Sequence, residues 1–535
     1  MLATGGQKTR HDGLAAAAAL LGAVVLLVLT APSARAGEAR ISAQRPLGDR
    51  GIELTVATTA FAGPVKVQVY LPVGYAEQPA RRWPVTYYLG GTNHDETTFA
   101  SYGGERLTRG YGSIIVAPRG DSGYWSDWYN GGAGGAPQYE TFVIDQLIPL
   151  IDATYRTAPG GAHRAIFGES MGGYGVMMLA ARHPDLFTAA SSLSGAGDSN
   201  LHPNQEVLTA SPLLQGGSPD AIYGPRGTQE VRWRGHNPVD LVGNLRDVDL
   251  QVLTADGTLD PALGEQPGDL PGCALEIAVA NGSRSFHRAL TAAQVPHRFV
   301  EYPAGCHSVP NFAREIADSL PAFTAAFARP RKVPARFSFR AIEPRFAVWG
   351  WDVAADPARA LEFLELRDAG RSGLTVTGSG ATRVTTPPFF PRLTKVDVVT
   401  GGATTVVRPD AAGRLAVPVD LGPPHAVQQY TRGAPTASAT AAVVLRPHAR
   451  ASFTTLRAGR VCVRAIGGSI PRATITVRRA GRRSTAATVR LSRATTVARC
   501  RPLPRLAPGR YAATLRGRDG FGHVVAATRA LRLSR

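Results

Sequence analysis

The sequence predicts an α/β domain with a mainly parallel sheet, followed by two all-β modules of the sandwich type. From residue 52 to residue 330, short β-branched or aromatic runs alternate with longer segments of helical period, which is typical of βαβ units. After residue 330, the apolar runs are short and are separated by Gly, Pro and Asp turns. A chain of 535 residues is long enough for about three to four domains.

The α/β domain is assigned to residues 37–330. Its strands are expected at residues 52–58, 65–71, 85–89, 113–117, 165–168, 189–193, 250–254 and 298–302. Its helices are expected at residues 139–154, 171–182, 275–293 and 309–328. Helices that alternate with strands in this way cross over between parallel neighbours in the sheet.

The two β modules are assigned to residues 331–432 and 433–535, on either side of a linker near residues 431–440. Strands of the first module are expected at residues 337–342, 347–353, 374–377, 396–399 and 415–419. Those of the second are expected at residues 461–463, 474–477, 487–491, 511–515 and 520–531. The stretch from Leu506 to Tyr511 resembles the lead-in to a late strand of bacterial immunoglobulin-like modules, so immunoglobulin-like sandwiches are predicted.

The amino-terminal segment, residues 1–36, has the features of a secretory signal peptide. Lys8 and Arg10 precede an apolar run over residues 14–29, and Ala34-Arg35-Ala36 offers a small-x-small cleavage site before Gly37. The alternative is a membrane anchor, but the run is short and Ala-rich and no second apolar span follows it. We therefore expect a secreted or cell-envelope protein with no transmembrane span after cleavage.

Four cysteines occur in the chain, an even number that favours structural disulfides in an exported protein. Three connectivities are possible, and sequence proximity favours Cys273 with Cys306 and Cys462 with Cys500. No Cys-x-x-Cys or His-rich spacing indicates a metal site, and no cofactor is expected.

The formal net charge of +19 is concentrated at the carboxyl end. Residues 441–535 contain 21 Arg, no Lys and a single acid, Asp519, whereas residues 37–440 carry a net charge of −3. A codon bias toward Arg explains the shortage of Lys but not that of acids, so compositional bias and attachment to an anionic cell-envelope polymer both stay open. Nucleic acid is not an expected partner, because this segment has few aromatics and no recognisable binding motif.

The sharpest local motif is Gly168-Glu-Ser-Met-Gly172, a G-x-S-x-G pattern between an expected strand and an expected helix. Such a strand-turn-helix elbow exposes a serine hydroxyl on a tight bend that glycines permit, as in α/β-hydrolases. The motif therefore indicates Ser170 as a nucleophile. The amide of Met171, the residue after the nucleophile, is the first expected donor to the oxyanion.

A serine nucleophile needs a histidine base that is oriented by an acid, and in this class the chain order is serine, acid, histidine. His307 is favoured as the base because it follows an expected strand in a turn, whereas His287 is expected within a helix and His297 at the start of a strand. The position of the acid after the strand at residues 250–254 indicates Asp256 or Asp260. Glu276 is a further candidate.

Residues from about 85 to 328 resemble the putative-esterase family that includes the antigen 85 mycolyltransferases and the S-formylglutathione hydrolases. The matching stretches are Ser126-Asp-Trp-Tyr129, Tyr139-Glu-Thr-Phe142, the elbow with Ala180-Ala-Arg-His-Pro184, Ser192-Leu-Ser-Gly195 and Gly305-Cys-His-Ser308. In the antigen 85 branch the acid resembles a Leu-Glu pair on a helix, with Asn and Phe further along. Leu275-Glu276, Asn281 and Phe286 fit that pattern, so the resemblance ranks Glu276 above Asp260.

The resemblance also bears on the second oxyanion donor and on the substrate. It implies Thr92, in Leu89-Gly-Gly-Thr92, as that donor. Gly90, Asn93 and Val309 stand where the antigen 85 enzymes carry Asp, Arg and Trp, which disfavours trehalose mycolyl transfer. An aromatic cluster is expected either to line an acyl or sugar cleft or to pack in the core. It comprises Tyr124, Trp125, Trp128 and Tyr129.

Together these features predict a secreted serine carboxylic-ester hydrolase that acts through an acyl-enzyme on a small-molecule or lipid ester. One alternative is an acyltransferase that delivers the acyl group to a sugar or cell-wall alcohol. Another is a non-catalytic cell-envelope binding protein. A Cys273–Cys306 disulfide would restrict the acid and base loops, or else merely join two surface loops.

Overall fold

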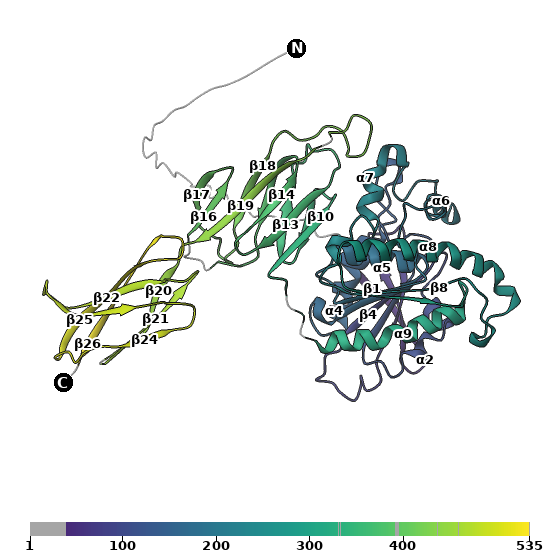
Figure 1. Cartoon of the computed structure of the whole chain (residues 1–535). Coiled ribbons are helices and arrows are strands. Elements are labelled where there is room, and N and C mark those ends of the chain that lie inside the picture. Colours follow the sequence, from purple (N-terminus) through teal and green to yellow (C-terminus); the bar gives the residue numbers. More distant parts are fainter. Residues whose placement is uncertain are drawn as a thin grey trace, which may run out of the picture.

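The computed structural model describes residues 39–329, 331, 333–390, 395–435, 437–457 and 459–533. The predicted signal peptide lies outside the described residues. An α/β part, a first β module and a second β module follow one another along the molecule (Figure 1). Within the described residues, no helix combines the length and the apolar character needed to span a membrane.

The α/β part is built on a nine-stranded mixed sheet of order β1-β2-β3-β5-β4-β6-β7-β8-β9. The run β5-β4-β6-β7-β8-β9 is parallel, and β1, β2 and β3 add antiparallel strands at one edge. The strands are β1 (Arg40–Leu47), β2 (Gly51–Ala57), β3 (Val65–Tyr70), β4 (Val85–Leu89), β5 (Ile114–Pro118), β6 (Arg164–Glu169), β7 (Ala189–Leu193), β8 (Asp249–Ala255) and β9 (His297–Tyr302). The sequence predicted all of these strands except β1, whose residues are mostly exposed and so lack an apolar pattern.

Helices cover both faces of this sheet (Figure 1). Residues of α5 (Met171–Arg182) and α8 (Leu270–Ala292) share one apolar core with one face, and α9 (Val309–Ala328) packs on the opposite face. The expected helix at 139–154 is a continuous series of α3 (Tyr139–Thr141), a π-helical segment (Phe142–Leu147) and α4 (Ile148–Thr154). Four further helices are α1 (Thr98–Ser101), α2 (Gly104–Leu107), α6 (Asn204–Ala210) and α7 (Arg226–His236).

The first β module consists of two antiparallel sheets around one core. Their orders are β10-β13-β14-β19-β16-β17 and β11-β12-β15-β18. The strands are β10 (Arg336–Ala341), β11 (Arg345–Val348), β12 (Trp351–Ala354), β13 (Leu364–Gly370), β14 (Gly373–Gly378), β15 (Gly380–Thr385), β16 (Val396–Thr400), β17 (Ala403–Val407), β18 (Ala416–Leu421) and β19 (Ala439–Pro447). Because β19 pairs with both β14 and β16, we propose that this module extends to Pro447 rather than to residue 432.

The prediction of a single strand at residues 347–353 of this module is wrong. Residues 347–353 form a hairpin, in which β11 pairs with β12 across a turn at Trp349 and Gly350. Both turn residues have positive φ, 50° and 79°, as two-residue hairpin turns require. The turn was not predicted, because Trp349 at its first position is not a residue that is typical of turns.

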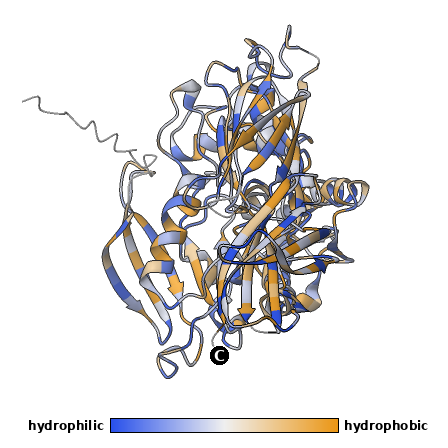
Figure 2. Ribbon diagram, turned by 90° about the vertical axis from the view of Figure 1, so that its left-hand side faces the viewer, coloured by the Kyte–Doolittle hydropathy of each residue, from blue (hydrophilic) through white to orange (hydrophobic). Residues whose placement is uncertain are grey.

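The second β module also has two antiparallel sheets, of order β20-β21-β24 and β23-β22-β25-β26, around its own core. Its strands are β20 (Arg450–Arg457), β21 (Arg460–Ile466), β22 (Arg472–Arg479), β23 (Thr485–Leu491), β24 (Arg499–Pro502), β25 (Gly509–Arg518) and β26 (Val524–Leu533). Hydrophilic and hydrophobic residues alternate along these strands (Figure 2), which fits one buried and one exposed face per sheet. The immunoglobulin-like type of both modules stays a prediction.

The largely buried side chain of Arg182 forms one ion pair within the α/β part and a second with the first β module. Arg182, at the end of α5, donates to Glu140 at 2.8 Å and to Glu343 at 2.6 Å. Replacing Arg182 with methionine leaves the buried Glu140 carboxylate without its main cation, so we expect the free energy of unfolding to fall by about 3 kcal/mol. Urea unfolding of this variant and of Arg288→Met, an exposed control position, measures the difference. Equal midpoints for the two variants would contradict the prediction.

Candidate active site

Ser170 lies on the bend between β6 and α5, with φ 56° and ψ −123°. Its amide donates to the carbonyl of Leu193 at 3.0 Å. The bend passes so close to β4 that a Cβ on Gly168 or Gly172 would lie 2.3 or 1.9 Å from the Leu89 carbonyl oxygen. The glycines of the motif therefore admit the close approach that exposes the serine.

His307 lies in the loop between β9 and α9, and one ring nitrogen is held by a carboxylate. Its Nδ1 is 2.8 Å from Oε2 of Glu276, a fully buried residue of α8. Its Nε2 is buried and has no hydrogen-bond partner among the described residues. The imidazole is thus oriented through Nδ1, and its Nε2 is free to accept a proton.

The other carboxylate oxygen of Glu276, Oε1, accepts three hydrogen bonds. Oε1 accepts from the Ser194 hydroxyl at 2.7 Å, the Thr254 hydroxyl at 2.9 Å and the Ala255 amide at 2.8 Å. Burial alone raises the pKa of Glu276, but the hydrogen bond and charge of His307, with the Ala255 and Ser194 donors, bring it below its usual value. Glu276 therefore faces His307 as a carboxylate.

A second carboxyl group lies behind this one. The Ser194 hydroxyl is 3.0 Å from Oε1 of Glu315, and Asn311 donates to the same hydroxyl at 3.3 Å. Burial, followed by the charge of Glu276, raises the pKa of Glu315 well above its usual value. Since Ser194 has one proton and gives it to Glu276, a protonated Glu315 completes the network by donating to Ser194.

The loop that carries His307 is fixed on its other side by Glu265, which is buried. Its carboxylate accepts from the Cys306 amide at 2.7 Å, the Ser308 hydroxyl at 2.5 Å and the Asp260 amide at 2.8 Å. Neither Glu265 nor Glu315 was identified from the sequence, because neither occurs in a recognisable motif. Asp260 instead caps a short 3-10 turn by accepting from the amides of Ala262 and Leu263, and Asp256 accepts from the Thr258 amide.

Both expected disulfides are present, Cys273–Cys306 and Cys462–Cys500. The first joins the first turn of α8 to the residue before His307, and the His307 amide donates to the neighbouring Gly272 carbonyl at 3.0 Å. Because the bond closes a segment of 33 residues, its loss is expected to reduce the free energy of unfolding by about 3 to 4 kcal/mol.

We expect the double variant Cys273→Ser/Cys306→Ser to lose both stability and turnover, because the loop of His307 is no longer tied to α8. Thermal unfolding and kcat for an ester substrate measure the two effects. The double variant Cys462→Ser/Cys500→Ser is the matched control, since it opens a bond of similar span in the second β module and is expected to keep kcat. A wild-type kcat in both double variants would contradict a role for the first disulfide in positioning the base.

The predicted oxyanion loop lies directly against the nucleophile. A Cβ on Gly91 would lie 3.2 Å from the Ser170 Cβ, and the Gly91 amide donates to Oε1 of the buried Glu169 at 2.7 Å. The His94 Nδ1 is 3.0 Å from the same oxygen. Glu169 and His94 therefore anchor the loop that contains Thr92.

A cavity of about 540 Å³ opens over these residues and is lined by Ser170, His307, Met171 and Thr92. Of the expected aromatic cluster, Tyr124 lines this cavity. Trp125 and Trp128 are buried and donate to the carbonyls of Gly90 and Gly123, at 3.1 and 3.2 Å. Much of the remaining wall is apolar, formed by Tyr102, Val207, Leu208, Leu275, Val279 and Phe312.

Residues 58–323 match the model of the family described as Putative esterase. This part of the chain belongs to that esterase family. An esterase of Mycobacterium tuberculosis (strain ATCC 25618 / H37Rv) is 33% identical over 272 residues, which cover 49% of this chain and 57% of that protein. The diacylglycerol acyltransferase/mycolyltransferase Ag85A of Mycobacterium gordonae is 28% identical over 212 residues, or 38% of this chain and 60% of that protein.

Among solved structures, that of Mycobacterium tuberculosis MPT51 is 22% identical, with a TM-score of 0.43, and the match covers 54% of this chain and 99% of that chain. The chain spans less than two thirds of the length of the esterase and of Ag85A. The sequence-based expectation of an esterase family with antigen 85 relatives is confirmed.

Proposed function

We propose that this member of the esterase family is a secreted serine hydrolase of carboxylic esters, with Ser170 as nucleophile, His307 as base and Glu276 as the acid that orients the base. The observation that supports this most strongly is the pairing of Glu276 with Nδ1 of His307, whose Nε2 has no partner among the described residues. His307 and Ser170 line one cavity. A triad needs this division of the two ring nitrogens.

In the proposed reaction, Nε2 of His307 takes the proton of Ser170 as the serine oxygen attacks the ester carbonyl. The tetrahedral oxyanion accepts hydrogen bonds from the amides of Met171 and Thr92. The carbon–oxygen bond to the alcohol then breaks, and the alcohol leaves with the proton from His307. Water repeats the sequence on the acyl-enzyme, which releases the acid and restores Ser170.

The apolar wall of the cavity favours an ester with an aliphatic or aromatic acyl group, since burying such a group stabilises the complex by about 25 cal/mol per Å². Val207, Leu208 and Phe312 are the residues proposed to contact it. Transfer of the acyl group to an alcohol instead of water is the second candidate function, supported by the similarity to an acyltransferase/mycolyltransferase.

Labelling with a fluorophosphonate probe tests the proposal. We expect one covalent adduct per chain, located on the Ser170 peptide by mass spectrometry, together with hydrolysis of p-nitrophenyl butyrate. Glycerol or trehalose added as an acceptor then separates hydrolysis from acyl transfer through the appearance of an acylated product. A chain that neither reacts with the probe nor cleaves the ester would instead be assigned a binding role.

The second β module is proposed to attach the enzyme to an anionic polymer of the cell envelope. Strand alternation turns most arginines of the four-stranded sheet to its outer face, opposite a core that includes Ile475, Val477 and Leu515. These exposed arginines are Arg472, Arg478, Arg490, Arg510, Arg516, Arg518 and Arg532. Binding to an anionic polymer that weakens as salt is raised would support this proposal.

A further inference from the structure

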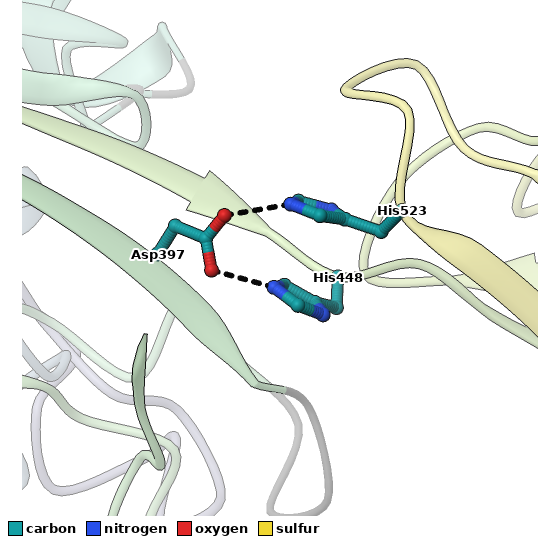
Figure 3. A group of neighbouring side chains, drawn as sticks. All are labelled: Asp397, His448 and His523. Atoms are coloured by element: carbon teal, nitrogen blue, oxygen red, sulfur yellow. Dashed lines mark hydrogen bonds and ion pairs between the residues drawn. The ribbon is translucent and has the colours of Figure 1, made fainter. Parts of the chain in front are cut away.

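A cluster of three side chains lies where the two β modules meet (Figure 3). Asp397 belongs to β16 of the first module, and His448 lies between the last strand of that module, β19, and the first strand of the second, β20. His523 lies in the turn between β25 and β26 of the second module. Side chains that are 51 and 126 positions away from Asp397 are thus brought to one carboxylate.

Both imidazoles present the same ring nitrogen to Asp397. Oδ1 is 2.6 Å from Nε2 of His448, and Oδ2 is 2.7 Å from Nε2 of His523. The rings are stacked, with centroids 3.6 Å apart and planes inclined by 14°. One ligand atom from each of the three residues lies within 4.8 Å of the other two. The spacing matches the ligand shell of a single metal ion.

The second nitrogen of His523 has its own carboxylate partner. Its Nδ1 is 2.9 Å from Oδ2 of Asp519, whose side chain is buried and also accepts from the amides of Ala449 and Phe521. A carboxylate on the far nitrogen is the usual arrangement for a metal-binding histidine, because it fixes the ring and its tautomer. Asp519 is also the single acid among residues 441–535.

We propose that Asp397, His448 and His523 bind a divalent transition-metal ion such as Zn²⁺ and that this ion links the two β modules. Two imidazoles and one carboxylate favour zinc and similar ions over Mg²⁺ and Ca²⁺, which prefer oxygen ligands. Bonds of about 2.0 to 2.2 Å in a tetrahedral site place ligand atoms about 3.3 Å apart. The carboxylate and the rings therefore separate by less than about 1 Å when the ion enters.

Water is the fourth ligand of the proposed site, since the side chains of Asp397, His448 and His523 keep 15%, 26% and 18% of their surface exposed. Each Nε2 that bears a proton releases it to solvent as the metal binds. Because the ligands come from both modules, the bound ion fixes the orientation of the arginine-rich module relative to the rest of the chain. Binding therefore stabilises the junction, and this stabilisation grows with the logarithm of the free metal concentration once that concentration exceeds the Kd.

The test uses the full mature chain, treated with EDTA and then freed of chelator. Calorimetric titration with ZnCl₂ is expected to show one site per chain, and titration with MgCl₂ none. Titration with CoCl₂ is expected to give the visible absorption of tetrahedral Co²⁺, which Zn²⁺ then removes. Because the cobalt spectrum is recorded on the unmodified chain, its absence would overturn the proposal even if every variant misfolded.

Variants assign the signal to these residues. His448→Ala and His523→Ala are expected to abolish the site, and Asp519→Asn is expected to weaken it by about 10- to 100-fold, as loss of an outer carboxylate does. His287→Ala is the matched control, because His287 contacts another histidine, His297, outside the β modules and its loss leaves the proposed site intact. A titration unchanged in His448→Ala and His523→Ala would contradict the proposal. Ester hydrolysis is measured in parallel and is expected to be independent of Zn²⁺, so the two proposals fail separately.

Discussion

Replacing Ser170 with alanine is expected to lower kcat for p-nitrophenyl butyrate by about 10⁵-fold or more, the scale seen when a triad nucleophile is removed. The substitution deletes the attacking oxygen and leaves the cavity and the pair of His307 with Glu276 in place. KM is therefore expected to change little. Initial rates at saturating substrate, with enzyme concentration determined independently, measure the effect.

Ser42→Ala is the matched control, because Ser42 lies in the edge strand β1 and its hydroxyl is exposed. Its kcat is expected to equal that of the parent. The thermal midpoint of Ser170→Ala should also match the parent, since alanine and serine meet the same steric conditions at φ 56°. Retention of more than a few percent of activity in Ser170→Ala would remove this residue as the nucleophile.

The sequence was most informative where one physical pattern dominated. The parallel strands β4, β6 and β7 are buried along their whole length, and β4 and β6 contain the apolar runs at residues 87–89 and 165–167. Helix α5 begins directly after Ser170, at Met171. The edge strand β1 escaped prediction because it buries almost nothing. Helix α8 begins at Leu270, five residues before the expected start at residue 275, and its first turn contains Pro271, where proline is tolerated.

The sequence predicted the site residues that belong to a motif or follow a strand. It did not predict the residues that hold them in position. Ser170 and His307 follow from an elbow and a turn after a strand, and both line the cavity. A choice between Glu276 and Asp260 needed the resemblance, because the order of residues along the chain admits both. Glu265 and Glu315 act through contacts between distant segments, which no spacing reveals. The cluster of Asp397, His448 and His523 was not predicted either, because its residues are far apart in the sequence and form no metal-binding motif.

Glu276→Gln is expected to reduce kcat by about 10⁴-fold, comparable to neutralising the orienting acid in other triads. The environment of Glu276 determines how the amide must lie. The Ala255 amide can only donate, so it requires the glutamine oxygen at the position of Oε1. The glutamine NH₂ then faces Nδ1 of His307 and holds the ring in the tautomer with its proton on Nε2, which cannot accept the proton of Ser170.

Asp260→Asn is the matched control, because asparagine also caps the turn that Asp260 begins. Its kcat is expected to stay within about twofold of the parent, since surface changes away from the site have small effects. Rates for both variants, with fluorophosphonate labelling as a second readout, distinguish the two acids. The reverse result, with activity lost in Asp260→Asn and kept in Glu276→Gln, would mean that the contact between Glu276 and His307 at 2.8 Å is not the one used in turnover. That contact is the most direct support for the proposed triad. Such a result would therefore contradict both the assignment of Glu276 as the acid and the proposed orientation of His307.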